Sequence, residues 1–241
     1  MRSLLFVPAD GGAKLDKAMA SGADAVILDL EDSIAPERKA HARAAALEFL
    51  KAAQTKKQRP RLLVRINGLD TGMIDADLEA VVAGRPDAIV FPKAEGGASV
   101  VHLDAKLTAR EAIAGLPEGG IKILAQAVES AAGLFAAGTY RGASARLIGM
   151  TWGPEDLSAE LGAQANRDAA GHLTEPYRLA RNICLYGAAA AKLPAIETVY
   201  VDFRNTEGLR RDTQDARRDG FAGRRASCVS RRRPSELRKS T

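Results

Sequence analysis

The chain has 241 residues, of which 46% are hydrophobic and 27% are charged, and its formal net charge is +5 at pH 7. These values are ordinary for a globular protein, and no apolar run approaches the ~18 residues that a membrane span needs. The two cysteines, Cys184 and Cys228, predict neither a disulfide framework nor a cysteine-based metal site. We therefore expect a cytoplasmic protein without a membrane segment.

The positive charge is concentrated at the C-terminal end of the chain. Residues 222–241 contain seven basic residues and one acidic residue, whereas residues 1–221 contain 28 basic and 29 acidic residues. The body of the protein is thus close to neutral and has no basic stripe of the kind that binds nucleic acid. We expect no nucleic-acid partner.

Short apolar runs alternate with stretches of helical period along residues 1–221, which is the pattern of a parallel α/β fold. The run over residues 25–30 is almost continuously apolar, as expected of a strand that is covered on both faces. The predicted strands are residues 3–8, 25–30, 61–66, 88–92, 122–128, 146–151 and 198–201. The predicted helices are residues 13–20, 36–53, 76–83, 100–114, 131–137, 155–161, 175–191 and 207–219.

Seven strand–helix units of similar length, with no glycine-rich nucleotide turn after the first strand, favour a (β/α)₈ TIM barrel over a doubly wound sheet. The eighth unit is missing from the pattern, because the sequence after Phe221 turns to Arg and Ser without an apolar strand. We therefore predict a barrel domain over residues 1–223 and an irregular basic tail over residues 224–241. The barrel is then expected to be open between its first and seventh strands.

Polar residues recur at the carboxyl ends of the predicted strands, where barrel enzymes carry their functional groups. One charged residue at a strand end is usually a solvated cap, but six polar strand ends that converge on one mouth indicate a site. These residues are Asp10, Asp29, Glu31, Asp32, Arg65, Asn67, Lys93, Glu95, Gln126, Glu129, Glu155 and Asp156.

Glu129 and Asp156 follow adjacent strands, so their carboxylates are expected to meet at one side of the mouth. Two carboxylates, together with waters and a substrate oxygen, suit Mg²⁺ or Mn²⁺, because hard cations prefer oxygen ligands. The three histidines fall on predicted helices or a loop, so they offer no ligand set for a softer metal. The alternative is that both acids merely cap the helices that follow them.

Two basic residues also lie at this mouth. Arg65 interrupts an apolar strand, and a buried guanidinium needs a partner, which is either an acid such as Asp29 or Glu31 or the carboxylate of a substrate. The residues alone leave both roles open. Lys93 suits a Schiff base only if its pKa is lowered, and the neighbouring acids favour a lysine that stays charged.

Six ordered segments resemble signature segments of the citrate lyase β-subunit-like proteins in the HpcH/HpaI aldolase family. They are Ser-Leu-Leu-Phe-Val-Pro (3–8), Ala-Val-Ile-Leu-Asp-Leu-Glu-Asp-Ser (25–33), Val-Arg-Ile-Asn (64–67), Phe-Pro-Lys (91–93), Val-Glu-Ser-Ala (128–131) and Gly-Pro-Glu-Asp-Leu (153–157). The resemblance covers about residues 3–221. It implies a TIM barrel that assembles as a homo-trimer or homo-hexamer and binds Mg²⁺ through Glu129 and Asp156.

The resemblance also implies Mg²⁺-dependent cleavage or formation of a carbon–carbon bond in a citryl-, malyl- or citramalyl-type acyl thioester of coenzyme A or an acyl-carrier protein. The products are a 2-oxo acid and an acetyl thioester, and the metal stabilises the charge that develops as the bond breaks. Arg65 is expected to grip the carboxylate, with Asp29, Lys93 and Glu129 in the substrate site. The alternatives are a class II aldolase acting on free 2-oxo acids and a truncated, non-catalytic barrel.

The chain departs from the family pattern in two places. The first loop, which commonly reads Val-Pro-Gly, has Ala9 here. Family members continue after the match to residues 220–223 into an eighth strand with an Ile-His-Pro segment and a C-terminal helical region, whereas this chain becomes rich in Arg and Ser. The change resembles a shift of reading frame and an early stop, which predicts a mobile tail without a selected function and weak or absent turnover.

Overall fold

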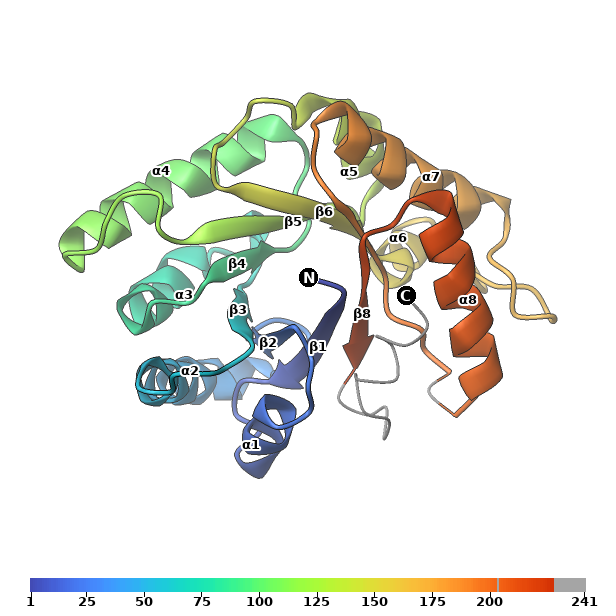
Figure 1. Ribbon diagram of the computed structural model, residues 1–241. Helices are drawn as coiled ribbons and strands as arrows, with labels where there is room; N and C mark the ends of the chain where they lie inside the picture. Colours follow the sequence, from blue (N-terminus) through green and yellow to red (C-terminus); the bar gives the residue numbers. More distant parts are fainter. Residues whose placement is uncertain (203, 228–241) are drawn as a thin grey trace.

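The computed structural model describes residues 1–202 and 204–227 of the protein. Parallel strands β1 to β8 close into a barrel in sequence order, and the helices surround it (Figure 1). The strands are β1 Ser3–Pro8, β2 Ala25–Asp29, β3 Arg61–Arg65, β4 Ala88–Phe91, β5 Lys122–Val128, β6 Leu147–Trp152, β7 Ala195–Glu197 and β8 Gly223–Ser227. The predicted TIM barrel is confirmed.

The helices follow the strands in the alternation that the sequence predicted, with the short helix α6 inserted between β6 and α7. They are α1 Ala13–Met19, α2 Lys39–Gln54, α3 Ile74–Val81, α4 Gly97–Ile113, α5 Ala131–Ala136, α6 Pro154–Glu160, α7 Glu175–Ala190 and α8 Thr206–Asp219. Local chemistry sets several of their ends: the Ser130 and Asn205 side chains cap α5 and α8, and Gly220 ends α8 with a left-handed φ of 111°.

Alternate residues of each strand build two apolar layers, because successive side chains of a strand point to opposite faces. Side chains such as Leu4, Ile27 and Leu124 fill the barrel interior. Their neighbours, such as Val26 and Val64, pack between the barrel and the helices. The interior-facing positions become polar only towards the carboxyl ends of the strands, and this change in character places the candidate site.

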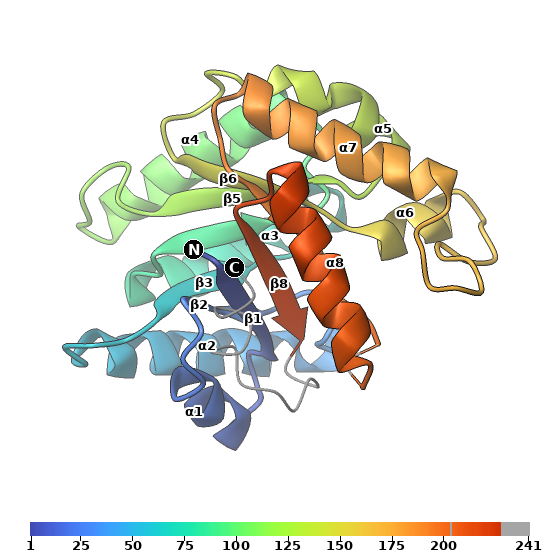
Figure 2. The ribbon, with the colours of Figure 1, turned by 45° about the vertical axis from the view of Figure 1, so that its right-hand side comes forward.

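The prediction that the eighth strand is missing was wrong. Residues 224–227 pair with residues 3–6 of β1, and residues 223–224 pair with the end of β7 (Figure 2). Without β8, both neighbouring strands would present unpaired backbone N–H and C=O groups, so backbone pairing favours a strand there whatever its side chains. A glycine is also needed at position 223, since a Cβ there would overlap the carbonyl oxygen of Met1. The rest of the predicted tail, residues 228–241, lies outside the described residues.

The two arginines of β8 explain why an apolar pattern does not reveal this strand. Arg224 points outward, where Nη2 lies 2.5 Å from Asp212 Oδ2 on α8 and Nη1 donates to the Thr198 carbonyl oxygen at 3.1 Å. Arg225 points into the barrel, and both side chains are only 3% exposed. Arg224 has an acidic partner at the far end of its long side chain, Arg225 has neutral hydrogen-bond acceptors there, and the backbone pairs as an ordinary strand.

The seventh strand was predicted at residues 198–201, but β7 is Ala195–Glu197. A glutamate at the end of this short strand, Glu197, breaks its apolar pattern. The Glu197 carboxylate is buried, and it accepts hydrogen bonds from Trp152 Nε1 at 2.5 Å and Arg181 Nε at 2.6 Å. A buried acid that has both partners is compatible with a strand interior, and a pattern of apolar residues alone does not show those partners.

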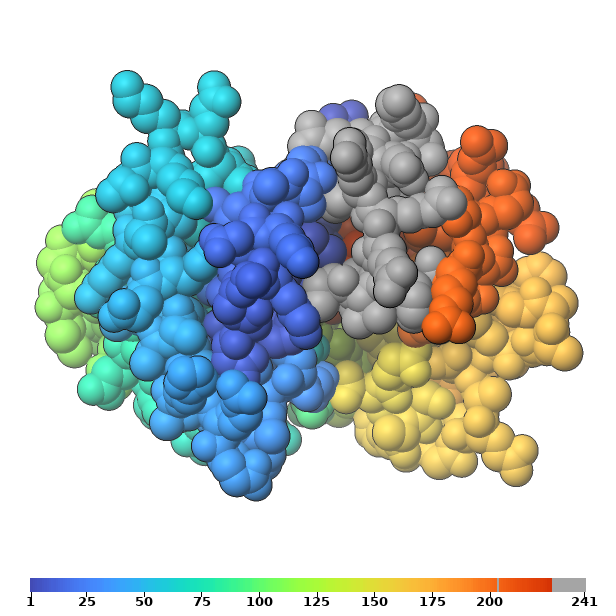
Figure 3. Space-filling model, turned by 90° about the horizontal axis from the view of Figure 1, so that it is seen from below, coloured from blue at the N-terminus to red at the C-terminus, as the bar shows by residue number. Residues whose placement is uncertain are grey.

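Seen from below, the N-terminal segment, in blue, and α8, in orange, lie on the same face of the molecule, with α8 to the right of the N-terminal segment (Figure 3). This arrangement follows from barrel closure, which brings the first and last strands together. Within the described part of the chain, we find no helix that is both long and apolar enough to cross a membrane.

Candidate active site

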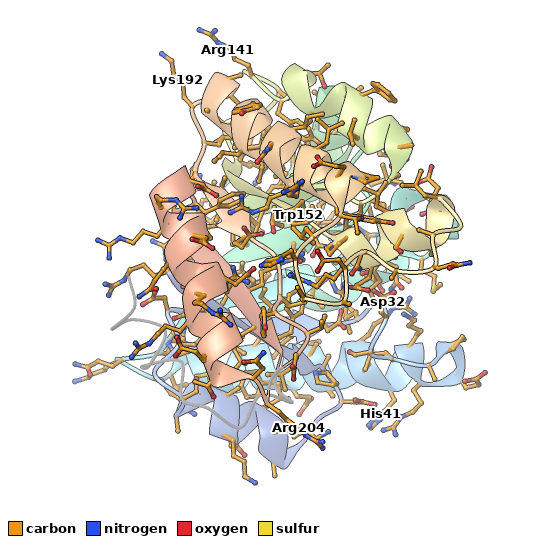
Figure 4. All side chains as sticks on the ribbon, turned by 90° about the vertical axis from the view of Figure 1, so that its right-hand side faces the viewer. Asp32, His41, Arg141, Trp152, Lys192 and Arg204 are labelled. Carbon is orange, nitrogen blue, oxygen red and sulfur yellow. The ribbon has the colours of Figure 1, made fainter. Side chains whose placement is uncertain are left out.

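Four of the predicted site residues line a pocket of about 390 Å³ at the carboxyl end of the barrel, namely Asp29, Arg65, Glu129 and Asp156. The fifth, Lys93, lines a second pocket that shares Glu129 and Asp156 with the first. Figure 4 shows Asp32, which borders the first pocket, on the side of the molecule away from Arg141 and Lys192, which precede β6 and β7. The charged side chains that line the first pocket are Asp29, Asp32, Arg65, Glu129, Glu155, Asp156 and Arg225. A hollow of about 740 Å³ lies at the opposite end, and none of these charged residues lines it.

Arg65 is held by acids on β2 and the loop after it. Asp29 lies opposite Arg65 in the strand register and takes the guanidinium fork through two bonds, Nε to Oδ1 at 2.6 Å and Nη2 to Oδ2 at 2.7 Å. Arg65 Nη1 also lies 2.7 Å from Glu31 Oε2 and 3.2 Å from Asp32 Oδ2. The internal ion pair that the sequence left open is therefore present, and a role in binding substrate stays a prediction.

The two acids closest to Arg65 have opposite protonation tendencies. Burial alone would raise the pKa of Asp29, but the hydrogen bonds and charge of Arg65 outweigh burial and hold that pKa below its usual value. Burial raises the pKa of Glu31 to about 8, against the attraction of Arg65. At neutral pH the guanidinium is thus neutralised mainly by Asp29.

Glu129 lies at the end of β5 with its carboxylate buried and oriented from two sides. Oε1 accepts a hydrogen bond from Gln126 Nε2 at 2.6 Å, and Oε2 accepts one from the backbone N–H of Lys93 at 3.1 Å. A Cβ at Gly153 would overlap Oε1, so glycine is required beside this carboxylate. Burial raises the pKa of Glu129, and the charge of Arg225 is the largest influence that lowers it.

Lys93 has a left-handed φ of 47°, which is unusual for a residue other than glycine and lets its N–H reach Glu129. Its ammonium lies 3.9 Å from Glu31 Oε1 and 4.0 Å from Asp156 Oδ1. Although burial lowers the pKa of Lys93, these carboxylates raise it above its usual value. A charged ammonium is a poor nucleophile, which disfavours Schiff-base chemistry.

Asp156 stands in the first turn of α6 and borders the same pocket as Glu129. Burial and the charge of Asp32 raise its pKa, and its side chain is 34% exposed. Across residues 1–202 and 204–227 there is no cluster of three or more His, Cys, Asp or Glu side chains that could enclose a metal ion. Two carboxylates beside an open pocket nevertheless fit Mg²⁺, which usually keeps several waters and takes one or two protein carboxylates.

Comparison with known proteins identifies the family. Residues 2–228 match the HpcH/HpaI aldolase/citrate lyase family. The chain belongs to this family. Citrate lyase subunit beta of Leuconostoc mesenteroides subsp. cremoris is 34% identical over 222 residues, which are 92% of this chain and 71% of that protein. The (3S)-malyl-CoA thioesterase of Cereibacter sphaeroides (strain KD131) is 35% identical over 223 residues, with the same two coverages.

Solved structures share the fold. Protein CitE from Mycobacterium tuberculosis in complex with magnesium and acetoacetate has a TM-score of 0.81 and 33% identity, covering 99% of this chain and 89% of that chain. The same protein in complex with magnesium, acetoacetate and coenzyme A has a TM-score of 0.80 and 32% identity, covering 99% and 80%. The resemblance drawn from the six segments is confirmed, and the family match extends through β8. Membership in this family supports the predicted lyase class.

Other polar strand ends of this family member support the barrel mouth instead of lining the pocket. Asp10 forms an ion pair with Arg38 at 3.0 Å. The Asn67 side chain is buried behind the mouth, where Oδ1 accepts from Lys39 Nζ and Nδ2 donates to Asp77 Oδ2, both at 2.7 Å. The Lys39 ammonium also donates to the carbonyl oxygens of residues 30 and 31, so it fixes the loop that carries the acids.

Sequence reasoning missed Arg225, which lines the pocket from β8. It was assigned to the tail, because residues 224–227 contain only one apolar residue, Ala226, and therefore show no apolar run typical of a strand. Its partner across the barrel, Gln126, was easier to find, since Gln126 lies near the end of a clear strand. The alternation of faces along Gly223–Ser227 would have placed Arg225 inside, once the strand itself was known.

Proposed function

We propose that the protein is a Mg²⁺-dependent carbon–carbon lyase that cleaves or forms a citryl-, malyl- or citramalyl-type acyl thioester. The products of cleavage are a 2-oxo acid and an acetyl thioester. The observation that carries the proposal is the convergence of Glu129, Asp156 and Arg65 on one pocket in a member of this family. Two carboxylates offer oxygen ligands to a metal, and the guanidinium offers charge to a substrate carboxylate.

Glu129 and Asp156 would hold the metal, with waters and substrate oxygens completing its coordination. When bound, Mg²⁺ supplies Lewis acidity to the oxygen on which negative charge develops. Support comes from the M. tuberculosis relative, which is described in complex with magnesium and acetoacetate. Mn²⁺ has the same oxygen preference and is expected to substitute.

Asp29, Arg65 and Lys93 would bind the substrate or orient the groups that contact it. Asp29 fixes the plane of the Arg65 guanidinium through two hydrogen bonds, and Arg65 lines the pocket, where a substrate carboxylate would compete with Glu31 and Asp32 for Nη1. The Lys93 backbone orients Glu129, and the Lys93 ammonium balances the charge of Asp156. Each of these groups is held by a strand or by the first residues after it, as a preorganised site requires.

The carrier and the assembly are part of the proposal. The complex of the M. tuberculosis relative with coenzyme A favours coenzyme A over an acyl-carrier protein. A homo-trimer or homo-hexamer would cover large apolar side chains such as Phe135 on α5 and Tyr186 on α7, which are 88% and 67% exposed. A cytoplasmic location is consistent with the buried, unpaired thiol of Cys184. Light scattering of the purified protein tests the assembly.

The decisive experiment is turnover of a malyl-type coenzyme A thioester with and without Mg²⁺. We expect formation of a 2-oxo acid and acetyl-CoA that stops on chelation with EDTA and in both Glu129→Gln and Asp156→Asn. Glu118→Gln changes an exposed acid far from the pocket and serves as the control. We expect Mg²⁺ to raise the melting temperature of the parent, and the same variants should lose this stabilisation. Turnover that survives EDTA and both substitutions would contradict the proposal.

The two alternatives are distinct outcomes of this experiment. A class II aldolase would act on a free 2-oxo acid and ignore the thioester. A non-catalytic barrel would bind Mg²⁺ and the acid without turnover. The prediction of weak turnover was based on a missing eighth strand and on the change of the family's C-terminal region, and the closed barrel removes only the first of these reasons. Turnover well below an ordinary rate, on the order of 10 per second, therefore stays a prediction.

A further inference from the structure

Arg225 is a buried cation whose partners are all neutral. Its Nη1 donates to Gln126 Oε1 at 2.8 Å, and its Nη2 donates to the Trp152 carbonyl oxygen and to Thr198 Oγ1, the latter at 3.3 Å. Its Nε is buried without a hydrogen-bond partner, and no carboxylate of the described residues lies within ion-pair distance of it. The side chain nevertheless lines the pocket that holds Glu129 and Asp156.

A guanidinium does not lose its proton in a protein, so this charge is fixed. A buried charge without an opposite charge in direct contact has a high free energy, because neutral hydrogen bonds replace only part of its hydration. Any anion that enters the pocket lowers that free energy, and any cation raises it. Low effective dielectric inside the barrel makes both effects larger than they would be at the surface.

A short hydrogen-bond chain connects Arg225 to Glu129. The guanidinium donates to the carbonyl end of the Gln126 amide, and this contact turns the amide nitrogen towards Glu129 Oε1, to which it donates at 2.6 Å. Gln126 is fully buried, so its amide is held in this orientation. Arg225 thus positions Gln126 and, through it, the first oxygen of the carboxylate that is offered to a metal.

We propose that Arg225 is a specificity-determining residue that weakens the binding of a free divalent cation at Glu129 and Asp156 and strengthens the binding of a carboxylate ligand in the same pocket. The cation part rests on the proposed function, because it assumes that these two acids hold the metal. One charge acts on both ligands with opposite signs. A structural role would instead weaken both, since a damaged pocket binds neither ligand well.

Arg225→Met tests this inference. Methionine is unbranched and flexible, and it fills buried space without a charge. Calorimetric titration with Mg²⁺ alone should show binding about tenfold tighter than in the parent, and titration with pyruvate at saturating Mg²⁺ should show binding about tenfold weaker. The melting temperature should be unchanged or higher, because the substitution breaks no ion pair of the described residues.

Two controls accompany the variant. Arg225→Lys keeps a charge at this position but not the guanidinium fork, so both affinities should stay within about threefold of the parent. Arg211→Met removes a charge of the same type from the exposed face of α8 and should change neither affinity. The second control separates the local charge from the net charge of the protein.

Each result decides the matter. Opposite changes of the two affinities in Arg225→Met, absent in both controls, support the proposal. Weakening of both affinities, or no change in either, overturns it. Glu129→Gln is titrated with Mg²⁺ in parallel: if this variant binds the metal like the parent, the proposed metal site fails whatever Arg225 does, and the cation part of the inference fails with it. If only the Arg225 result is contrary, the proposed function stands.

Discussion

The two arginines of the barrel mouth both lie over the ring of Phe6 but have different electrostatic surroundings. Arg65 on β3 is 4.9 Å from the ring centroid, and Arg225 on β8 is 5.5 Å from it. Arg65 is paired with three acids, and Asp29 takes two of its donors. Arg225 donates only to an amide, a carbonyl and a hydroxyl.

Because their surroundings differ, Arg65 on β3 and Arg225 on β8 have different effects on the pocket. The Arg65 side is close to electrically neutral and rigid, because two hydrogen bonds fix the guanidinium plane. Burial alone would lower the pKa of both arginines. The acids reverse that effect at Arg65 and raise its pKa, whereas the pKa of Arg225 stays lowered. The Arg65 side therefore sets geometry, and the Arg225 side sets the electric field that a ligand meets.

The largest expected effect on the difference between the two arginines comes from substitution of Asp29, the main partner of Arg65. Asp29→Asn removes the charge that neutralises Arg65 and replaces one acceptor oxygen of the fork by a donor. Breaking a buried ion pair leaves an uncompensated charge, so we expect the free energy of unfolding to fall by about 3 kcal/mol. Denaturation with urea measures this. Asp32→Asn is the matched control, because Asp32 contacts the same guanidinium but is 58% exposed, and its loss should cost less than about 1 kcal/mol. Equal effects of the two substitutions would refute the assignment of Asp29.

On the Arg65 side, Glu31 should make the stability of the protein depend on pH. The pKa of Glu31 rises from its usual 4.5 to about 8 on folding, so the folded protein keeps a proton that the unfolded chain loses in this interval. The unfolded state then binds fewer protons, and the free energy of unfolding falls as pH rises from about 5 to about 8. We expect a loss of about 2 kcal/mol over this range, and Glu31→Gln should abolish most of it. A parent and variant with parallel pH profiles would show that Glu31 is not the titrating group.

Most of the fold was predictable because its signals are local. Strands such as Ala25–Asp29 are continuous apolar runs, and their helices show a regular period, so seven units and the barrel followed from the sequence. The two errors, in β7 and β8, share a cause. Glu197 and Arg225 are charged residues inside strands, and their partners, Trp152, Arg181 and Gln126, are distant in sequence. Satisfaction of a buried charge by distant residues is a tertiary property that periodicity does not contain.

The candidate site divides in the same way. Arg65 and Glu129 end or follow strands with clear patterns, so their convergence on one pocket could be predicted from strand ends. The partner of each of these side chains could not be predicted from the sequence. The sequence left Arg65 open between an acid and a substrate, and only the strand register shows Asp29 directly opposite it. Arg225 was invisible for the further reason that its strand was not recognised.

The smallest expected effect on stability comes from Arg65→Lys, which asks whether Arg65 contacts substrate as well as Asp29. Lysine keeps the charge but replaces the planar fork by a single ammonium, so one of the two bonds to Asp29 is lost. We expect the free energy of unfolding to fall by about 1 kcal/mol. If Arg65 also orients a substrate carboxylate, pyruvate binding at saturating Mg²⁺ should weaken about tenfold. A loss of folding stability alone would not change the affinity of the folded protein for pyruvate. Calorimetry and thermal melting of the same samples separate the two quantities. A lower melting temperature with unchanged pyruvate affinity would leave Arg65 with only its ion pair, and Arg225 would then be the guanidinium that a carboxylate ligand meets in this mouth.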